Sequence, residues 1–161
     1  MNRPALLAAA AALLIAAPLL AQPLPAVEVG RIERLERFAS RHVDARHVDV
    51  WLPDACTATA RCDVLYMHDG QMLFDAATTW NRQAWQVHTT LSRLIAAGRV
   101  APTIVVGVWN NGELRHSEYF PEKFLRHVPE PQRAQVVAKG LAGRPRADAY
   151  LRFLVEELKP A

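Results

Sequence analysis

A short apolar run that ends abruptly in a polar loop is the feature that most constrains the fold. Val64 to Met67 are apolar, and His68-Asp69-Gly70-Gln71 come directly after them. This pattern predicts a strand buried on both faces, opening into a tight loop at its C-terminal end. Ligands bind at that edge of an open α/β sheet, and glycine lets backbone N–H groups approach a ligand closely. Gly70 is therefore either a plain turn residue or part of a site for a developing oxyanion.

Two further strands and one helix surround this run. Arg46 to Leu52 alternates apolar and polar residues, which predicts a half-buried strand, and Thr103 to Trp109 predicts a strand buried on both sides. Between the two buried strands we expect a helix capped by Thr79 or Asn81 and ended by Gly98. A helical crossover between buried strands implies that they run parallel, in an α/β fold.

The periodicity of the remaining segments is less decisive. Val27 to Ser40 fits a helix or a bulged strand equally well. Glu113 to Pro145 is a long polar excursion, of the kind that forms lids or binding loops. From Ala147 to Leu158 an amphipathic helix is expected, closed by Pro160.

The N-terminus has the pattern of a secretory signal peptide. Arg3 supplies a positive charge, Ala5 to Leu20 is apolar, and Ala21 or Ala26 is a small residue at which cleavage could occur. We therefore assign residues 1–26 to a signal peptide and residues 27–161 to the mature domain, and expect a periplasmic or secreted protein.

Export affects how the two cysteines are interpreted. Cys56 and Cys62 lie in a small polar loop between two predicted strands. In an oxidising compartment a disulfide between them is favoured over two free thiols. No C-x-x-C motif or nearby histidine pair accompanies them, so a zinc site is disfavoured, and we expect no metal and no cofactor.

Length and charge narrow the class of protein. The chain has 161 residues, a formal charge of +3 and a pI near 9.2. This length suits one globular domain. Arginines are interleaved with acidic residues along the chain rather than clustered, so nucleic-acid binding is not expected, nor is membrane attachment once the signal is removed.

Several of these segments together resemble one family. The sequence from Tyr66 to Asp75 resembles the putative-esterase family of α/β-hydrolases, which includes enterochelin-esterase-like, esterase-D-like and feruloyl-esterase branches and the mycolyltransferases. The resemblance extends over most of the chain after Arg46. Its other motifs are Thr79-Trp80-Asn81, Thr103 to Trp109, Ser117 to Pro121 and Tyr150 to Pro160.

The resemblance implies a site and a mechanism. In this family the amide after the Asp-Gly pair, here that of Gln71 with Gly70 setting its orientation, holds the substrate carbonyl oxygen. The second donor comes after the nucleophilic serine in a G-x-S-x-G elbow. No such motif occurs in these 161 residues, and the family's acidic residue and histidine come later still. The expected fold is thus a truncated α/β-hydrolase: the N-terminal strands and flanking helices, lacking the elbow and every later element.

The serines present do not replace the elbow. Ser40, Ser92 and Ser117 all lack a strand-turn-helix context, and we interpret His116 and Ser117 as surface polar residues. His68 and Asp69 lack a third metal ligand and are assigned to packing and to loop hydrogen bonding.

Aromatic residues near the strand ends are candidates for substrate contacts. Trp80, Trp109 and Tyr119 could line an acyl pocket, or they could be core packing. In the family's sheet order the strand Asp63 to Met67 lies between Thr103 to Trp109 and the elbow strand, so one of its edges is expected to be bare and to promote self-association.

The sequence therefore predicts a fragment of a secreted serine esterase that acts on small-molecule carboxylic esters through an acyl-enzyme and is inactive alone. A non-catalytic periplasmic binding or interaction module is the alternative. A partial gene product without independent function is a third possibility.

Overall fold

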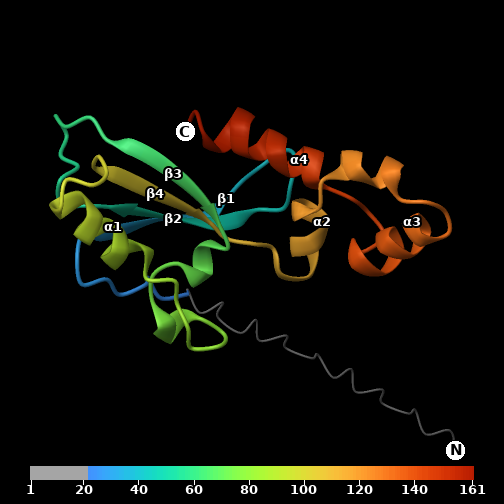
Figure 1. The fold of residues 1–161 in the computed structure, drawn as a ribbon, viewed down its shortest axis with the longest axis horizontal. Helices are drawn as coiled ribbons and strands as arrows, with labels where there is room; N and C mark the ends of the chain where they lie inside the picture. Colours follow the sequence, from blue (N-terminus) through green and yellow to red (C-terminus); the bar gives the residue numbers. More distant parts are fainter. Residues whose placement is uncertain (1–21) are drawn as a thin grey trace, which may run out of the picture.

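The computed structural model describes residues 22–161, whose centre is a four-stranded sheet in the order β1-β2-β4-β3 (Figure 1). The strands are β1 (Arg31–Phe38), β2 (Arg46–Leu52), β3 (Asp63–His68) and β4 (Thr103–Val108). β3 and β4 are parallel, as the helical crossover predicts, whereas β1/β2 and β2/β4 are antiparallel. The sheet is therefore mixed. Residues 1–21 of the predicted signal peptide lie outside the described residues.

The N-terminal segment is a bulged strand rather than a helix. β1 pairs with β2, and the register shifts between Leu35 and Phe38. Arg34 on β1 forms a bidentate pair with Asp49 on β2, with Nε–Oδ1 and Nη2–Oδ2 distances of 2.6 and 3.0 Å. The prediction that β2 is half-buried is wrong, because Asp49 and Trp51 on its expected polar face are fully buried.

Two apolar cores lie on opposite faces of the sheet. On one face, α1 (Val87–Ala96) contributes Val87 and Leu91 to a core built around Trp51. On the other face, α4 (Ala147–Arg152) continues into the π-helical turn η6 (Phe153–Leu158). This helix packs against β2 and β4; the buried members of that core are Val43, Val48, Val106, Val108, Tyr150, Phe153 and Leu158.

Helix α1 begins later than the capping residues suggest. Thr79 Oγ1 and Asn81 Oδ1 both accept the N–H of Gln83, at 3.0 and 3.1 Å. These side chains therefore stabilise a turn, and the helix starts only after Gln86, whose φ of 55° is left-handed. The predicted cap is wrong in position, although Gly98 does come after the helix end, with its N–H on the carbonyl of Ile95.

Strand β3 is exposed, in contrast to the prediction that both its faces are buried. Val64 is 50%, Leu65 41% and Tyr66 38% exposed. Within residues 22–161, β3 pairs only with β4, which leaves it at the edge of the sheet.

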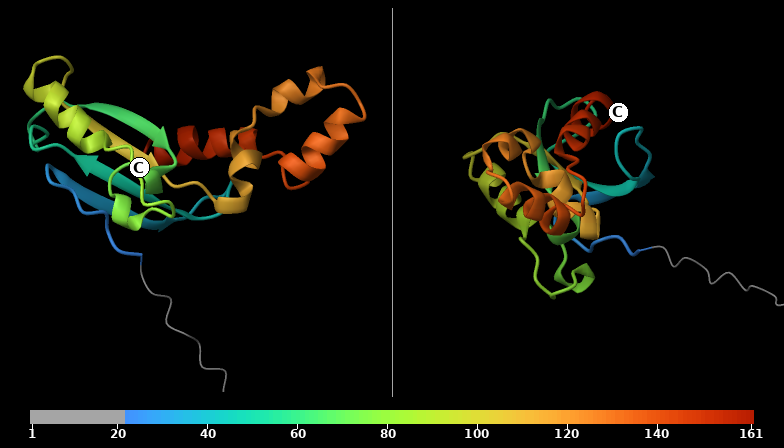
Figure 2. Two further views of the ribbon diagram at one scale, coloured as in Figure 1. Left: turned by 60° about the horizontal axis from the view of Figure 1, so that its bottom comes forward. Right: turned by 90° about the vertical axis from the view of Figure 1, so that its right-hand side faces the viewer.

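The long polar excursion is a series of short helices. It extends beyond one end of the sheet, and α4 leads back from it (Figure 2). Arg46 on β2 anchors it through two 2.7 Å hydrogen bonds to the buried Glu118. Its elements are η3 (Gly112–Leu114), α2 (Arg115–Tyr119), η4 (Glu122–His127), α3 (Gln132–Gln135) and η5 (Val136–Gly140).

Two loops complete the body. Cys56 and Cys62 are joined by a disulfide, with their Cα atoms 6.0 Å apart. The segment before β1 packs on the domain, since Pro25 is buried and the N–H of Ala26 donates to Asp75 Oδ2 at 3.0 Å. No helix within residues 22–161 is long and apolar enough to cross a membrane.

Candidate active-site half

The loops after β3 and β4 meet at one edge of the sheet because these two strands are parallel. Asp69 comes after β3 and Asn110 after β4, and Asn110 Nδ2 donates to Asp69 Oδ1 at 2.8 Å. Arg115, the first residue of α2, forms a bidentate pair with the same carboxylate, at 2.8 Å from Nε and 2.7 Å from Nη2. Three segments are thus tied together at Asp69.

The hydrogen bonds around Asp69 keep it ionised. Those from Arg115 lower the pKa of the Asp69 carboxyl, against the opposing effect of burial. Tyr119 also contacts this carboxylate through its hydroxyl, at 3.4 Å. Burial, reinforced by the Asp69 charge, raises the pKa of Tyr119 to about 12, so its hydroxyl stays protonated at neutral pH.

Gly70 occupies a position where only glycine fits. A Cβ built there would lie 2.3 Å from the carbonyl oxygen of Gly107 on β4. The preceding Asp69 has left-handed backbone angles (φ 56°, ψ 44°), which turn the chain into the 3-10 helix η1 (Gly70–Met72). The loop therefore rests directly on the β4 backbone.

The side chain and the backbone amide of Gln71 have different roles. The side-chain Oε1 accepts the N–H of Asn110 at 3.2 Å, which holds the residue in place. Among residues 22–161, the backbone N–H of Gln71 has no hydrogen-bond acceptor. A free amide on a rigid, glycine-supported turn is the kind of donor that stabilises a developing oxyanion.

A cavity of about 560 Å³ borders this loop. Two tryptophans stand at it largely exposed, Trp80 at 86% and Trp85 at 54%. The cavity is lined by Asp69, Gln71, Met72, Trp80, Trp85, Asn110, Gly112 and Arg115. It combines aromatic surface with polar groups, which is typical of small-molecule sites.

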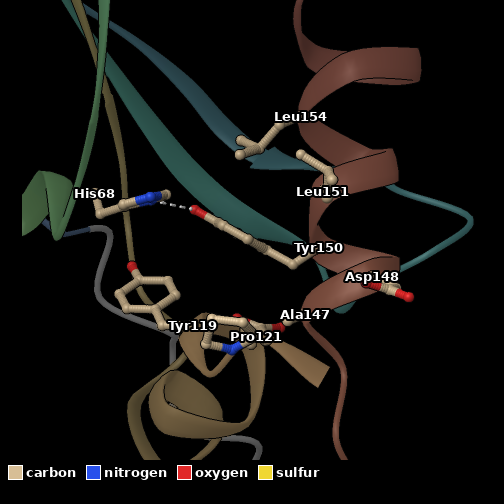
Figure 3. A pocket seen from close by; sticks show the side chains of 9 residues that line it. His68, Tyr119, Pro121, Ala147, Asp148, Tyr150, Leu151 and Leu154 are labelled. Carbon is tan, nitrogen blue, oxygen red and sulfur yellow. Dashed lines mark hydrogen bonds between the residues drawn. The ribbon is translucent and has the colours of Figure 1, made fainter. Parts of the chain in front are cut away.

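The other aromatic residues predicted from the sequence lie elsewhere. Trp109 donates its indole N–H to Asp49 at 2.9 Å and has the Arg34 guanidinium 4.9 Å from its ring. Tyr119 lines a second, more apolar hollow of about 370 Å³ together with His68 and Tyr150 (Figure 3). The structure brings Trp80 and Gln71 to one cavity and places Trp109 and Tyr119 outside it.

Ser117 is fully buried, in contrast to the expectation that it is a surface residue. Ser117 donates its hydroxyl to the carbonyl of Arg144 and so connects α2 to the segment before α4. His116 is exposed. Ser117 is therefore a packing residue with a satisfied hydroxyl.

Sequence reasoning missed three residues of the cavity: Trp85, Asn110 as a partner of Asp69, and Arg115. Asn110 could have been found, since polar residues at the ends of parallel neighbouring strands share one sheet edge. Nothing in the local pattern around Arg115 indicates its partner. Residues 22–161 contain no group of three His, Cys, Asp or Glu side chains arranged to hold a metal.

Comparison with known proteins identifies the family. Residues 40–161 match the family described as "Putative esterase", and the chain belongs to that family. No curated protein matches significantly.

A solved structure shares this fold, and two others are similar to the chain over most of its length. The BES protein from Bacillus cereus superposes with a TM-score of 0.54 at 17% identity, covering 88% of this chain but 48% of its own. An IroE-like serine hydrolase from Shewanella oneidensis gives 0.49 at 21% identity, covering 81% and 37%. A ferulic acid esterase from Anaeromyces mucronatus gives 0.45 at 16%, covering 86% and 44%. The chain thus spans about half the length of these structures or less.

Proposed function

We propose that these 161 residues form the oxyanion-binding half of an exported serine esterase and contribute no turnover alone. The observation that carries the proposal is the free backbone N–H of Gln71, held on a turn that only glycine at position 70 allows. Membership of the esterase family supports the reaction class. The predicted signal peptide and the Cys56–Cys62 bond support export.

The charges beside the loop suit this role. During attack on an ester, the carbonyl oxygen gains negative charge, and a backbone N–H stabilises it. The Asp69 carboxylate would oppose that charge, but the Arg115 guanidinium pairs with both of its oxygens. Arg115 thereby neutralises the local field and fixes the loop. The nucleophile and the second oxyanion donor belong to an elbow motif that these residues do not contain.

The two exposed tryptophans suggest the substrate class. Trp80 and Trp85 border the cavity beside Gln71 and offer flat apolar surface. Aromatic side chains of this kind bind planar or apolar groups. The expected ligand is a small carboxylic ester with an aromatic or apolar acyl or alcohol part.

Binding can be tested without turnover. A non-reactive aryl phosphonate monoester imitates the anionic intermediate, and its binding beside Trp80 and Trp85 should quench tryptophan fluorescence saturably. Gly70→Ala forces the loop off the β4 backbone and should weaken binding at least tenfold. Gly140→Ala is the matched control, because Gly140 has open space around it and no left-handed backbone.

The outcomes separate this proposal from the alternative. Circular dichroism of the Gly70→Ala variant verifies that it is folded. Equal phosphonate affinity in folded Gly70→Ala and in the wild-type chain would remove the oxyanion role and leave the non-catalytic binding module.

A further inference from the structure

The outer side of β3 carries unused backbone hydrogen-bonding groups. The N–H of Asp63 donates to the carbonyl of Pro102 at 2.9 Å, and β3 runs parallel to β4 from Asp63↔Thr103 to His68↔Val108. Backbone groups of successive residues in a strand point to opposite sides. The N–H and C=O groups of Val64, Tyr66 and His68 therefore point away from β4.

This edge lacks the features that normally prevent pairing. Its middle residues are apolar and exposed: Val64 at 50%, Leu65 at 41% and Tyr66 at 38%. The strand contains no proline or lysine, and its one acidic residue, Asp63, is at the end. Such an edge is a template for another strand.

The side chains of β3 are divided between the two faces of the sheet. His68 contacts Tyr150 of α4, so Val64 and Tyr66 face the α4 side as well. Met67 belongs to the core on the α1 side, which places Leu65 there too. Directly opposed residues in an antiparallel pair share a face. A symmetric pair of β3 strands must therefore oppose residues whose numbers are both even or both odd.

We propose that a second copy of this chain pairs antiparallel with β3 about a two-fold axis through Tyr66. In this register Tyr66 opposes Tyr66 of the second copy, and Val64 opposes His68. All outward N–H and C=O groups of Val64, Tyr66 and His68 are then paired in both copies. On the α1 side, Leu65 opposes Met67, so each exposed apolar residue gains an apolar or aromatic neighbour.

The adjacent register is less complete. An axis through Leu65 would pair Val64 with Tyr66 but place His68 opposite Cys62, which lies outside the strand. The groups of His68 would then lack a strand partner. The register centred on Tyr66 therefore pairs the edge most completely. It joins the four-stranded sheets of the two copies into one continuous sheet of eight strands.

The surface beside the edge extends the contact. Leu151 of α4 is 57% exposed and lines the hollow that also contains His68 (Figure 3). Apolar surface therefore continues from β3 onto α4, on the side where the second copy arrives.

Cysteine cross-linking tests the register. Both natural cysteines are in the disulfide, so Tyr66→Cys adds a single thiol. Hydrogen-bonded antiparallel pairs have Cα atoms about 5.5 Å apart, within disulfide range. Val64→Cys is the matched control, because four residues of offset separate its two copies by roughly 14 Å. Mild oxidation should give covalent dimers of Tyr66→Cys and leave Val64→Cys monomeric in denaturing gels.

Sedimentation tests the association itself. The unmodified chain should sediment as a dimer at micromolar concentration, and Tyr66→Lys should weaken the dimer at least tenfold, because like charges then oppose each other. Phe124→Lys is the control for added charge at an exposed apolar site on η4, outside the sheet. A monomeric wild-type chain, or cross-linking of Val64→Cys instead of Tyr66→Cys, would overturn the proposal. Phosphonate binding beside Trp80 is a separate readout, so failure here leaves the proposed function intact.

Discussion

Replacing Glu118 by glutamine should strongly destabilise the protein. Glu118 and Arg46 join at 2.7 Å through both pairs of atoms, and their side chains are 0% and 2% exposed. The guanidinium also lies 5.2 Å from the Tyr150 ring and 5.3 Å from the Phe153 ring, inside the core. Glu118→Gln leaves a buried, uncompensated positive charge. Removing one partner of such a pair costs about 3–5 kcal/mol, a large part of the roughly 5–15 kcal/mol typical of a domain.

Urea unfolding, monitored by circular dichroism, measures the loss in free energy of unfolding. Two controls isolate its cause. Glu130→Gln breaks a pair with Arg133 of similar length, 2.6 Å, whose side chains are 54% and 42% exposed, and should cost under about 0.5 kcal/mol. The double variant Arg46→Met/Glu118→Leu removes both charges and should be more stable than Glu118→Gln alone. A cost for Glu118→Gln equal to that of Glu130→Gln would refute the reasoning.

The pH dependence, the signal cleavage site and the disulfide can each be tested separately. The pKa of Asp69 is lowered in the folded state, so its ionised form stabilises the protein above the unfolded pKa near 4. This stability is lost as the pH falls through the folded pKa. In melting experiments at different pH values, Asp69→Asn should therefore reduce the fall of the melting temperature at acidic pH. Although the sequence pattern assigns residues 1–26 to the signal peptide, Pro25 is buried on the domain, so we expect processing after Ala21 rather than after Ala26; N-terminal sequencing of exported protein showing the later site would contradict this. Replacing Cys56 and Cys62 by serine should cost about 2 kcal/mol in urea unfolding, and a wild-type stability unchanged by reductant would argue against it.

Local sequence patterns were sufficient to predict the positions of β2, β3 and β4 and the loop after β3, whereas they left β1 undecided between a helix and a bulged strand. The apolar runs and their polar ends predicted β3, β4 and their parallel pairing, which in turn brings Asp69 and Asn110 to one edge. The resemblance to the esterase family, which is confirmed, singles out Gly70, and the structure gives the physical reason, since a Cβ at this position would meet the β4 backbone.

The features that the sequence did not reveal depend on contacts distant in the chain. Arg46 and Glu118 are 72 residues apart, and Arg115 finds Asp69 across 46 residues, so no local pattern announces either pair. The burial of Asp49 likewise depends on Arg34 from the neighbouring strand. Polar residues that alternate with apolar ones in a strand are expected to face solvent. On β2, however, Asp49 is buried and its charge is paired with that of the buried Arg34 side chain.

Ester hydrolysis by the purified 161-residue chain tests the central claim most directly. With an aryl ester such as p-nitrophenyl acetate, we predict release of p-nitrophenol at the rate of buffer alone, because the proposed site has one oxyanion donor and the 161 residues contain no G-x-S-x-G nucleophile motif. Loss of the serine nucleophile alone costs on the order of 10⁶ in turnover in the serine protease subtilisin. Saturable hydrolysis that a serine-reactive phosphonate abolishes would contradict the claim, and would require a nucleophile among Ser40, Ser92 and Ser117.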